Sequence, residues 1–182
     1  EIHTEMEGNS EHARYAPCSV AEMQAKGYQY WALGHVHEHW IQRGNTTIAY
    51  PGNLQGRHIR ELGARGALMV TAEDGEITEV DRLEVDVLRW HALEIDISAV
   101  ADLRGAVRLT GQAMEHLLEA TPADLPLAVR VIFKGRSAAH SQLVVDEGQL
   151  RQEVIAQAVA LDPDRIWVEK VRLTSEALAA AP

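Results

Sequence analysis

Residues 30–37 read Tyr-Trp-Ala-Leu-Gly-His-Val-His, an apolar run that ends in two histidines. A short apolar run of this kind is typical of a strand buried in a sheet. In an extended segment, the side chains of His35 and His37 would point to the same side, with backbones roughly 6.5–7 Å apart. Imidazoles so placed converge poorly on one ion, but each can bind one member of a metal pair separated by about 3.5–4 Å. The run therefore predicts a sheet that presents metal ligands where a strand ends.

The histidine spacing alone is a weak indication of a metal site. The chain holds nine histidines in 182 residues, so pairs two residues apart arise by chance, and His37 and His39 form a second such pair. Neutral imidazole is nevertheless a common ligand for zinc, manganese and iron. The flanking sequence has to decide between a metal site and two unrelated surface histidines.

The rest of the first half is expected to consist of strands separated by turns. Asp74-Gly75 is a hairpin signal, and Ser19 is expected to cap a short helix that ends before Gly27. The loop over residues 51–58, Pro-Gly-Asn-Leu-Gln-Gly-Arg-His, follows a strand, as loops that line a site often do. The expected helix covers residues 19–26, and the expected strands cover residues 29–33, 47–50, 67–72 and 77–87.

The second half alternates between strand and helix patterns. Apolar residues with a period of two mark strands, and apolar residues with helical spacing mark helices between them. This βαβαβ order predicts a small α/β domain with its helices on one face of a sheet. The domain division is therefore expected at residues 1–88 and 89–182. The expected elements are strand 93–97, helix 100–118, strand 127–133, helix 150–161 and strand 167–173.

Composition limits the class of protein. No apolar run is long enough to cross a membrane, and the single cysteine, Cys18, fits a reducing cytoplasm. A formal charge of -10 argues against a broad basic surface for nucleic acid. It does not exclude a nuclease, because bound divalent cations can supply positive charge where a phosphate sits.

Several local motifs together resemble one family. They are Ile2-His3-Thr4, Tyr-Ala-Pro-Cys at residues 15–18, the segment 27–37 with its Gly-His-x-His, and Tyr-Pro-Gly-Asn-Leu-Gln-Gly-Arg-His-Ile-Arg-Glu at residues 50–61. The combination is similar to the C-terminal half of the phosphoesterase domain of bacterial DNA-repair exonucleases, the SbcD-like branch of the calcineurin-type metallophosphoesterases. The resemblance covers roughly residues 1–90. It implies the C-terminal half of a metallophosphoesterase β-sandwich, followed by the α/β domain as a capping domain that helps to place DNA.

The resemblance implies roles for individual residues. His3 and His35 correspond to ligands of one metal, and His37 to a ligand of the other. The two divalent ions are usually manganese, and they activate a water for attack on a DNA phosphodiester. Two such ions lower the pKa of the water, clamp the phosphate and offset charge in the transition state.

Four further residues are candidates for the substrate side of the site. Arg57 and His58 could contact a substrate phosphate, Arg57 through its bidentate fork, or could be plain surface charges. Asn53 and Gln55 could orient a metal-bound histidine or the phosphate, or could simply cap a turn. In the second half, a cluster around a strand end could meet a phosphate backbone or form a solvated loop. That cluster comprises Arg130, Lys134, Arg136 and His140.

The N-terminal motifs of the family have no counterpart in residues 1–182. An Asp-x-His, a bridging Asp and a Gly-Asn-His-Asp are all missing, so we expect a truncated piece of a longer nuclease that is inactive by itself. Two alternatives stay open: a non-catalytic DNA-binding or assembly module, and a metallophosphatase of small phosphoesters. The resemblance further implies DNA and an SMC-like ATPase as partners and allows a homodimer, and the lack of a long apolar run predicts no membrane association.

Overall fold

The computed structural model describes residues 2–3 and 18–178 of the chain. The chain divides into two compact units. The first comprises Glu1–Arg57 and Gly63–Asp86, and the second comprises His58–Leu62 and Val87–Pro182. Each unit has its own cluster of buried apolar side chains. The mixed α/β architecture confirms the fold class expected from the sequence.

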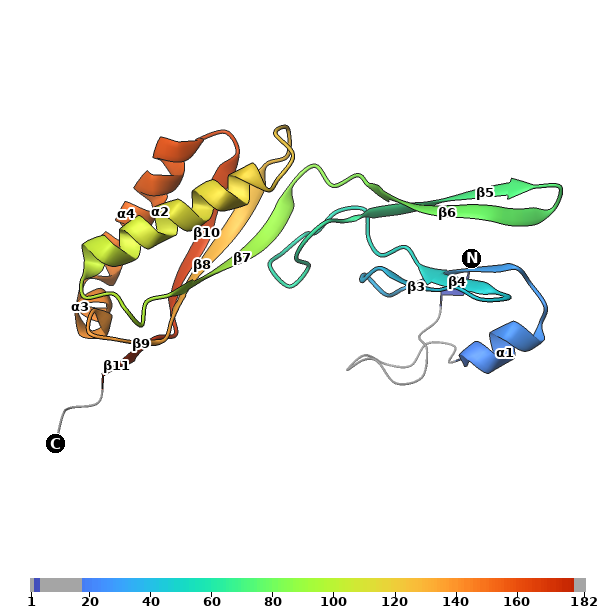
Figure 1. Ribbon diagram of the computed structural model, residues 1–182, viewed down its shortest axis with the longest axis horizontal. Helices are drawn as coiled ribbons and strands as arrows, with labels where there is room; N and C mark the ends of the chain where they lie inside the picture. The colour runs from blue at the N-terminus through green and yellow to red at the C-terminus, as the bar shows by residue number, and fades with distance from the viewer. Residues whose placement is uncertain (1, 4–17, 179–182) are drawn as a thin grey trace. The chain divides into compact units, whose positions relative to one another are not determined.

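The first unit contains a four-stranded sheet with the order β1-β2-β4-β3, of which β3 and β4 are labelled in Figure 1. Strands β1 (Ile2–His3), β2 (Tyr30–Gly34) and β4 (Thr47–Tyr50) are parallel, whereas β3 (Trp40–Gln42) runs antiparallel to β4. Strand β3 was not predicted, because three half-buried residues are too few to show a period. The core cluster of this sheet and of the adjoining helix comprises the buried residues Met23, Leu33, Ile48 and Tyr50.

Helix α1 (Val20–Ala25) confirms the predicted cap. The hydroxyl of Ser19 accepts a hydrogen bond from the Glu22 amide at 3.2 Å, and the Glu22 carboxylate accepts one from the Ser19 amide at 2.7 Å. This reciprocal capping box satisfies amides that a helix N-terminus otherwise leaves unpaired. Gly27 follows the helix with φ +73°, a conformation that favours glycine.

Strands β5 (Gly66–Glu73) and β6 (Glu76–Glu84) form a two-stranded antiparallel hairpin. Asp74 and Gly75 form its turn, with φ values of 51° and 87°, as an Asp-Gly hairpin turn requires. The side chain of Arg43 donates to the Val80 carbonyl at 2.9 Å, which ties the hairpin to the rest of the unit. The prediction that strand 77–87 extends to residue 87 is wrong, because β5 supplies no pairing partner beyond Gly66 opposite Glu84.

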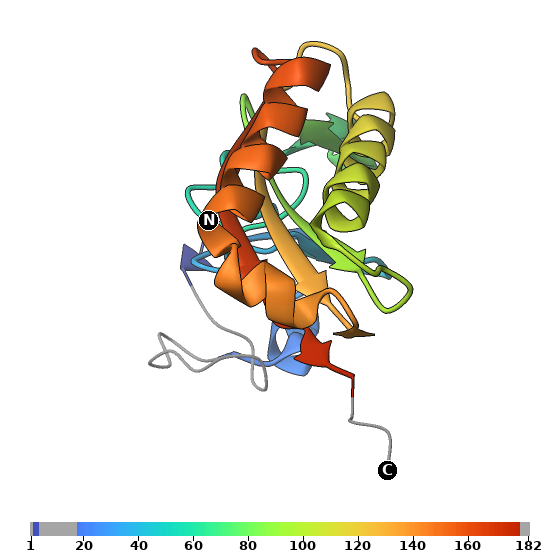
Figure 2. The same cartoon turned by 90° about the vertical axis from the view of Figure 1, so that its left-hand side faces the viewer.

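The second unit has the predicted βαβαβ order. Strands β7 (Arg89–Asp96), β8 (Leu127–Lys134) and β10 (Ile166–Leu173) form a parallel sheet with the order β10-β8-β7. Helices α2 (Leu103–Glu119) and α4 (Glu147–Leu161) cover one face of this sheet (Figure 2). Short elements complete the unit: β9 (Arg136–Ser137), α3 (His140–Val145) and β11 (Glu176–Ala177).

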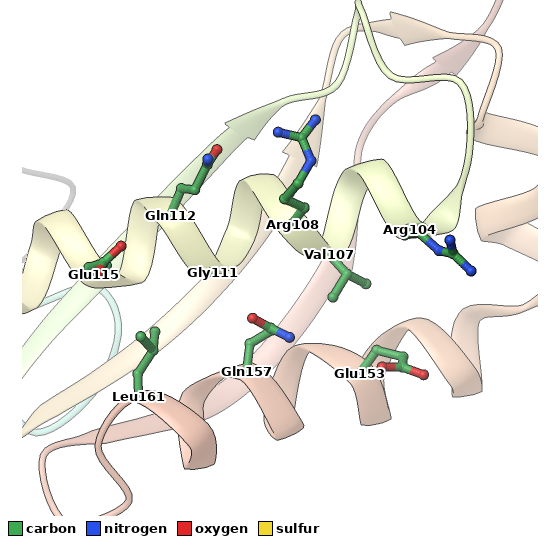
Figure 3. Close-up of a pocket in the computed structure, with 9 residues that line it drawn as sticks. All are labelled: Arg104, Val107, Arg108, Gly111, Gln112, Glu115, Glu153, Gln157 and Leu161. Atoms are coloured by element: carbon green, nitrogen blue, oxygen red, sulfur yellow. The ribbon is translucent and has the colours of Figure 1, made fainter.

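The helices α2 and α4 pack closely at a glycine. Gly111 is buried on α2, and a Cβ at this position would lie 2.6 Å from the Oε1 atom of Gln157 on α4. Figure 3 shows Gln157 pointing from α4 toward α2 at this position, beside a groove of about 460 Å³. Helix α2 begins at Leu103, three residues later than predicted, because the Asp102 carboxylate caps it by accepting from the Gly105 amide.

Candidate metal and phosphate site

The loop after β2 carries the two predicted metal ligands. Strand β2 ends at Gly34, and His35 has φ +89°, so the backbone is not extended through residue 37. The expectation that the two histidines follow the two-residue repeat of a strand is therefore wrong. A non-glycine residue in this conformation costs about 1–3 kcal/mol, and such strain is commonest at active sites and ligand clamps. Both His35 and His37 are exposed on the loop.

Strand β1 brings a third predicted ligand to the same edge of the sheet. His3 is in register with Gly34, and the two strands run parallel. Neighbouring parallel strands deliver their C-terminal ends to one edge, where sites of α/β sheets are usually built. The backbone of His3 therefore lies beside the residue that precedes His35, although the two are far apart in the sequence. The side chain of His3 lies outside the described part of the structure.

Arg65 binds the main chain of the histidine loop. This role was not predicted from the sequence. The residue is only 3% exposed. Its Nη1 donates to the carbonyl of His37 at 2.7 Å and to Oδ1 of Asn53 at 3.2 Å, and its Nη2 donates to Oε1 of Glu38 at 2.8 Å. A buried guanidinium with several hydrogen bonds fixes the groups that it joins. Arg65 therefore couples the loop at residues 37–38 to the loop at residue 53.

Gly52 allows these two loops to approach each other. It has φ +81°, and a Cβ there would lie 2.9 Å from the carbonyl oxygen of His37 and 3.1 Å from the amide of His39. The Asn53 amide also donates to the His37 carbonyl at 3.1 Å. The main chain of His37 is thus fixed by glycine packing and by two hydrogen bonds to its carbonyl.

Asn53 and Gln55 form hydrogen bonds within their own loop. Nδ2 of Asn53 donates to the Gln55 carbonyl at 3.0 Å, and Nε2 of Gln55 donates to the Gly56 carbonyl at 2.8 Å. Both contacts are typical of turn residues, which is the alternative considered from the sequence. Through Arg65, Asn53 also supports the main chain of His37, and a direct role toward phosphate stays a prediction.

Arg57 and His58 are both exposed. Nδ1 of His58 accepts from the Arg60 amide at 3.3 Å, and its Nε2 lies 4.0 Å from the carboxylate of the buried Glu61. The segment His58–Leu62 belongs to the second unit, whereas Arg57 ends a stretch of the first. A shared role of these two residues toward phosphate stays a prediction.

The donor set fits a metal in part. Two imidazoles suit zinc, manganese or iron. However, the described side chains contain no group of three or more histidine, cysteine, aspartate or glutamate residues that could hold an ion. These side chains alone do not complete a coordination shell.

The cations of the second unit that were considered for a phosphate backbone have carboxylate partners. Arg130 binds Glu169 through two hydrogen bonds of 2.8 and 2.7 Å, Lys134 pairs with Glu94, and Arg136 donates to Glu176 at 2.9 Å. His140 faces the Ser175 hydroxyl at 3.0 Å. These pairs favour the alternative interpretation, a solvated surface loop, over a phosphate-binding cluster.

Comparison with known proteins finds similarity to metallophosphoesterases. Residues 90–176 match the family model described as the middle domain of metallophosphoesterase YhaO. The chain is also 26% identical over 169 residues to a protein of Bacillus subtilis (strain 168) described as an uncharacterized metallophosphoesterase, YhaO. That alignment covers 91% of this chain and 40% of the relative, so the chain spans less than half of the relative's length. Together the two matches show that this chain is similar to metallophosphoesterases.

The length and apolarity of the described helices can be compared with what a membrane-spanning helix needs. None of them is both long enough and apolar enough to cross a bilayer.

Proposed function

We propose that this chain is part of a metal-dependent phosphoesterase and supplies histidine ligands from the loop after β2. The observation that supports this proposal most strongly is the geometry of the loop. His35 has φ +89°, and the buried Arg65 donates a hydrogen bond to the carbonyl of His37. The family matches support the same class of chemistry. Two exposed histidines, on a loop whose main chain is fixed at His37 and beside the end of β1, are a suitable start for a metal centre.

The proposed roles follow from chemistry. His3, His35 and His37 would hold divalent metal, for which we propose two manganese ions. Bound metal would lower the pKa of a water and clamp a phosphate. Arg65 and Gly52 position His37, and Arg57, an exposed guanidinium, would bind a phosphate oxygen through its fork.

We further propose DNA as the substrate, hydrolysed from its ends as in the SbcD-like exonucleases that residues 27–37 and 50–61 resemble. The same resemblance supports an SMC-like ATPase partner, a homodimer and a cytoplasmic location. Residues 1–182 by themselves are expected to be inactive. Manganese-dependent nuclease activity in a rigorously purified sample of these residues would contradict that expectation.

The test uses the whole protein as its gene encodes it. After chelation, hydrolysis of linear duplex DNA, bis-p-nitrophenyl phosphate and p-nitrophenyl phosphate is measured with added Mn²⁺, Mg²⁺ or Zn²⁺. We expect metal-dependent cleavage of DNA and of the diester, and about 100-fold lower activity for His37→Asn. His116→Asn, an exposed histidine on α2, is the matched control and should keep full activity.

Each remaining outcome has a defined meaning. Cleavage of the monoester alone would replace the nuclease proposal with a phosphatase of small phosphoesters. Binding of DNA without hydrolysis of any substrate would favour a non-catalytic module. Equal loss of activity in His37→Asn and His116→Asn would refute the role of the histidine loop.

A further inference from the structure

The outer edge of strand β10 offers backbone groups for pairing. In the sheet order β10-β8-β7, β10 has β8 on its inner side, and none of the described strands lies on its outer side (Figure 1). The amide of Thr174 donates inward to the Phe133 carbonyl at 2.8 Å. Alternate residues of a parallel strand turn their backbone groups to the same neighbour. Val171 and Leu173 therefore turn their amides and carbonyls away from β8.

A pocket borders this edge on the side of the helices. It has a volume of about 390 Å³ and is lined by Val144, Glu147, residues 170–173 of β10 and Thr174, which follows the strand. Val144 is 50% exposed, and its neighbour Val145 is 82% exposed. An apolar side chain beside the β10 edge could fill this hollow and cover part of Val144.

The side chains of β10 alternate in chemistry. Val171 and Leu173 pack on the side of the helices, against the core of the unit, whereas Lys170 and Arg172 are exposed. A strand added to a sheet continues this alternation, because its side chains stand beside those of its neighbour on each face. An added strand that fits this edge would therefore carry apolar residues toward Val144 and acidic residues toward Lys170 and Arg172.

A second copy of the chain fits this edge poorly. Pairing of β10 with its own copy about a two-fold axis would bring Lys170 and Arg172 close to the same residues of the copy. Like charges across a strand pair are destabilising. Although Glu169 already interacts with these two cations, charge complementarity still favours an acidic strand over a second copy.

We infer that the outer edge of β10 binds an extended segment of a partner protein, with alternating acidic and apolar residues, by strand addition. Main-chain hydrogen bonds would supply affinity, and the Val144 pocket would supply specificity. The bulge between Val168 and Lys170 interrupts the regular ladder, so the pairing is confined to Lys170–Thr174. This inference is independent of the proposed hydrolytic activity.

The experiment measures fluorescence anisotropy of a labelled peptide, Gly-Ser-Glu-Val-Asp-Val-Glu-Ser, with residues 1–182. We expect a Kd of about 10–100 µM, typical of a short peptide with a small interface, and weaker binding in high salt. A peptide with lysine in place of every acidic residue is the matched probe and should not bind. Hydrogen exchange with bound peptide should slow at the amides of Val171 and Leu173.

Variants distinguish binding of the peptide at the β10 edge from binding elsewhere on the surface. Val144→Asp and Arg172→Glu should each weaken binding at least tenfold. Val159→Asp and Arg151→Glu change exposed residues of α4 outside this pocket and should leave binding unchanged.

Three results would overturn the inference: no binding of the acidic peptide, equal binding of both peptides, or binding without slower exchange at β10. A dimer in sedimentation that Val144→Asp dissociates would instead assign the edge to a second copy.

Discussion

Gly66 and Gly111 show that the effect of replacing a glycine depends on which atoms lie beside its Cα atom. A Cβ at Gly66 would lie 1.8 Å from the carbonyl oxygen of Leu83, which belongs to the backbone of the paired strand β6. A Cβ at Gly111 would lie 2.6 Å from Oε1 of Gln157, the far end of a flexible side chain. The backbone can yield only by separating the two strands, whereas the side chain can rotate.

Alanine at these two positions should have opposite effects. We expect Gly66→Ala to lower the free energy of unfolding at the upper end of a range of about 1–3 kcal/mol, since it forces the hairpin apart. Gly111→Ala should be neutral or stabilising by up to about 1 kcal/mol, because alanine favours a helix and Gln157 can move. Urea denaturation of both variants is the measurement. Equal destabilisation would show that Gln157 is not free to rotate.

Arg65 should be the residue on which the histidine loop depends most. Arg65→Met keeps apolar volume but removes the bonds to the His37 carbonyl, to Asn53 and to Glu38. Loss of the donor to the part-buried His37 carbonyl and to Asn53 costs about 1–3 kcal/mol, whereas the exposed Glu38 carboxylate can turn to water. We expect faster amide exchange across residues 35–39, with little change in the second unit. Arg60→Met, at an exposed position, is the control, and an identical exchange pattern in both variants would contradict the role of Arg65.

At the scale of elements, β8 and β10 are joined by a side-chain pair as well as by their ladder. Arg130 on β8 donates twice to the Glu169 carboxylate on β10. These hydrogen bonds hold the pKa of Glu169 below its ordinary value of 4.5. A carboxylate with a lowered pKa stabilises the folded state above its ordinary pKa, and that contribution is lost as the pH falls through the lowered pKa.

Glu169→Gln should therefore be destabilising at neutral pH and nearly silent in acid. We expect a loss of about 0.2–1 kcal/mol at pH 7, the range for partly exposed pairs. The difference from the wild type should shrink as the pH falls below 4.5. Denaturant titrations between pH 3 and 7 measure it. A difference that stays constant over this range would mean that the pair contributes nothing through its charge.

At the scale of the whole molecule, the part of the chain that the structure describes has two separate cores, one in each unit. The first is small and includes Met23, Leu33 and Ile48, whereas the second is larger and is centred on strands β7, β8 and β10. Phe133 on β8 is fully buried in the second core. A substitution that destabilises one core should therefore destabilise mainly the unit to which that core belongs.

Phe133→Ala tests this independence. Truncation of a buried phenylalanine costs about 3–5 kcal/mol, from lost burial and from the cavity left behind. We expect faster hydrogen exchange throughout β7, β8, β10 and α4, with unchanged exchange in β2 and β4. Faster exchange to the same degree in both units would show that the chain unfolds as a single cooperative body.

Local physics explains most of what the sequence predicted. Leu127, Val129 and Phe133 repeat with the period of a strand, and the core of a sheet selects that period. Ser19 and Asp74-Gly75 satisfy backbone requirements within a few residues, so the α1 cap and the hairpin turn were predictable. The histidine motif was likewise visible as a pattern of neighbours in the chain.

Tertiary structure alone decided how the histidine loop is built. The register of His3 with Gly34 and the contacts of Arg65 join segments far apart in the sequence, and the loop that they hold includes the positive φ of His35. No local pattern distinguishes a buried arginine at residue 65 from the exposed arginines at residues 57 and 60. The sequence by itself determined the elements and the chemistry of the candidate ligands, because propensities, caps and turns act over a few residues. Their arrangement depends on packing between distant segments, which only the folded chain defines.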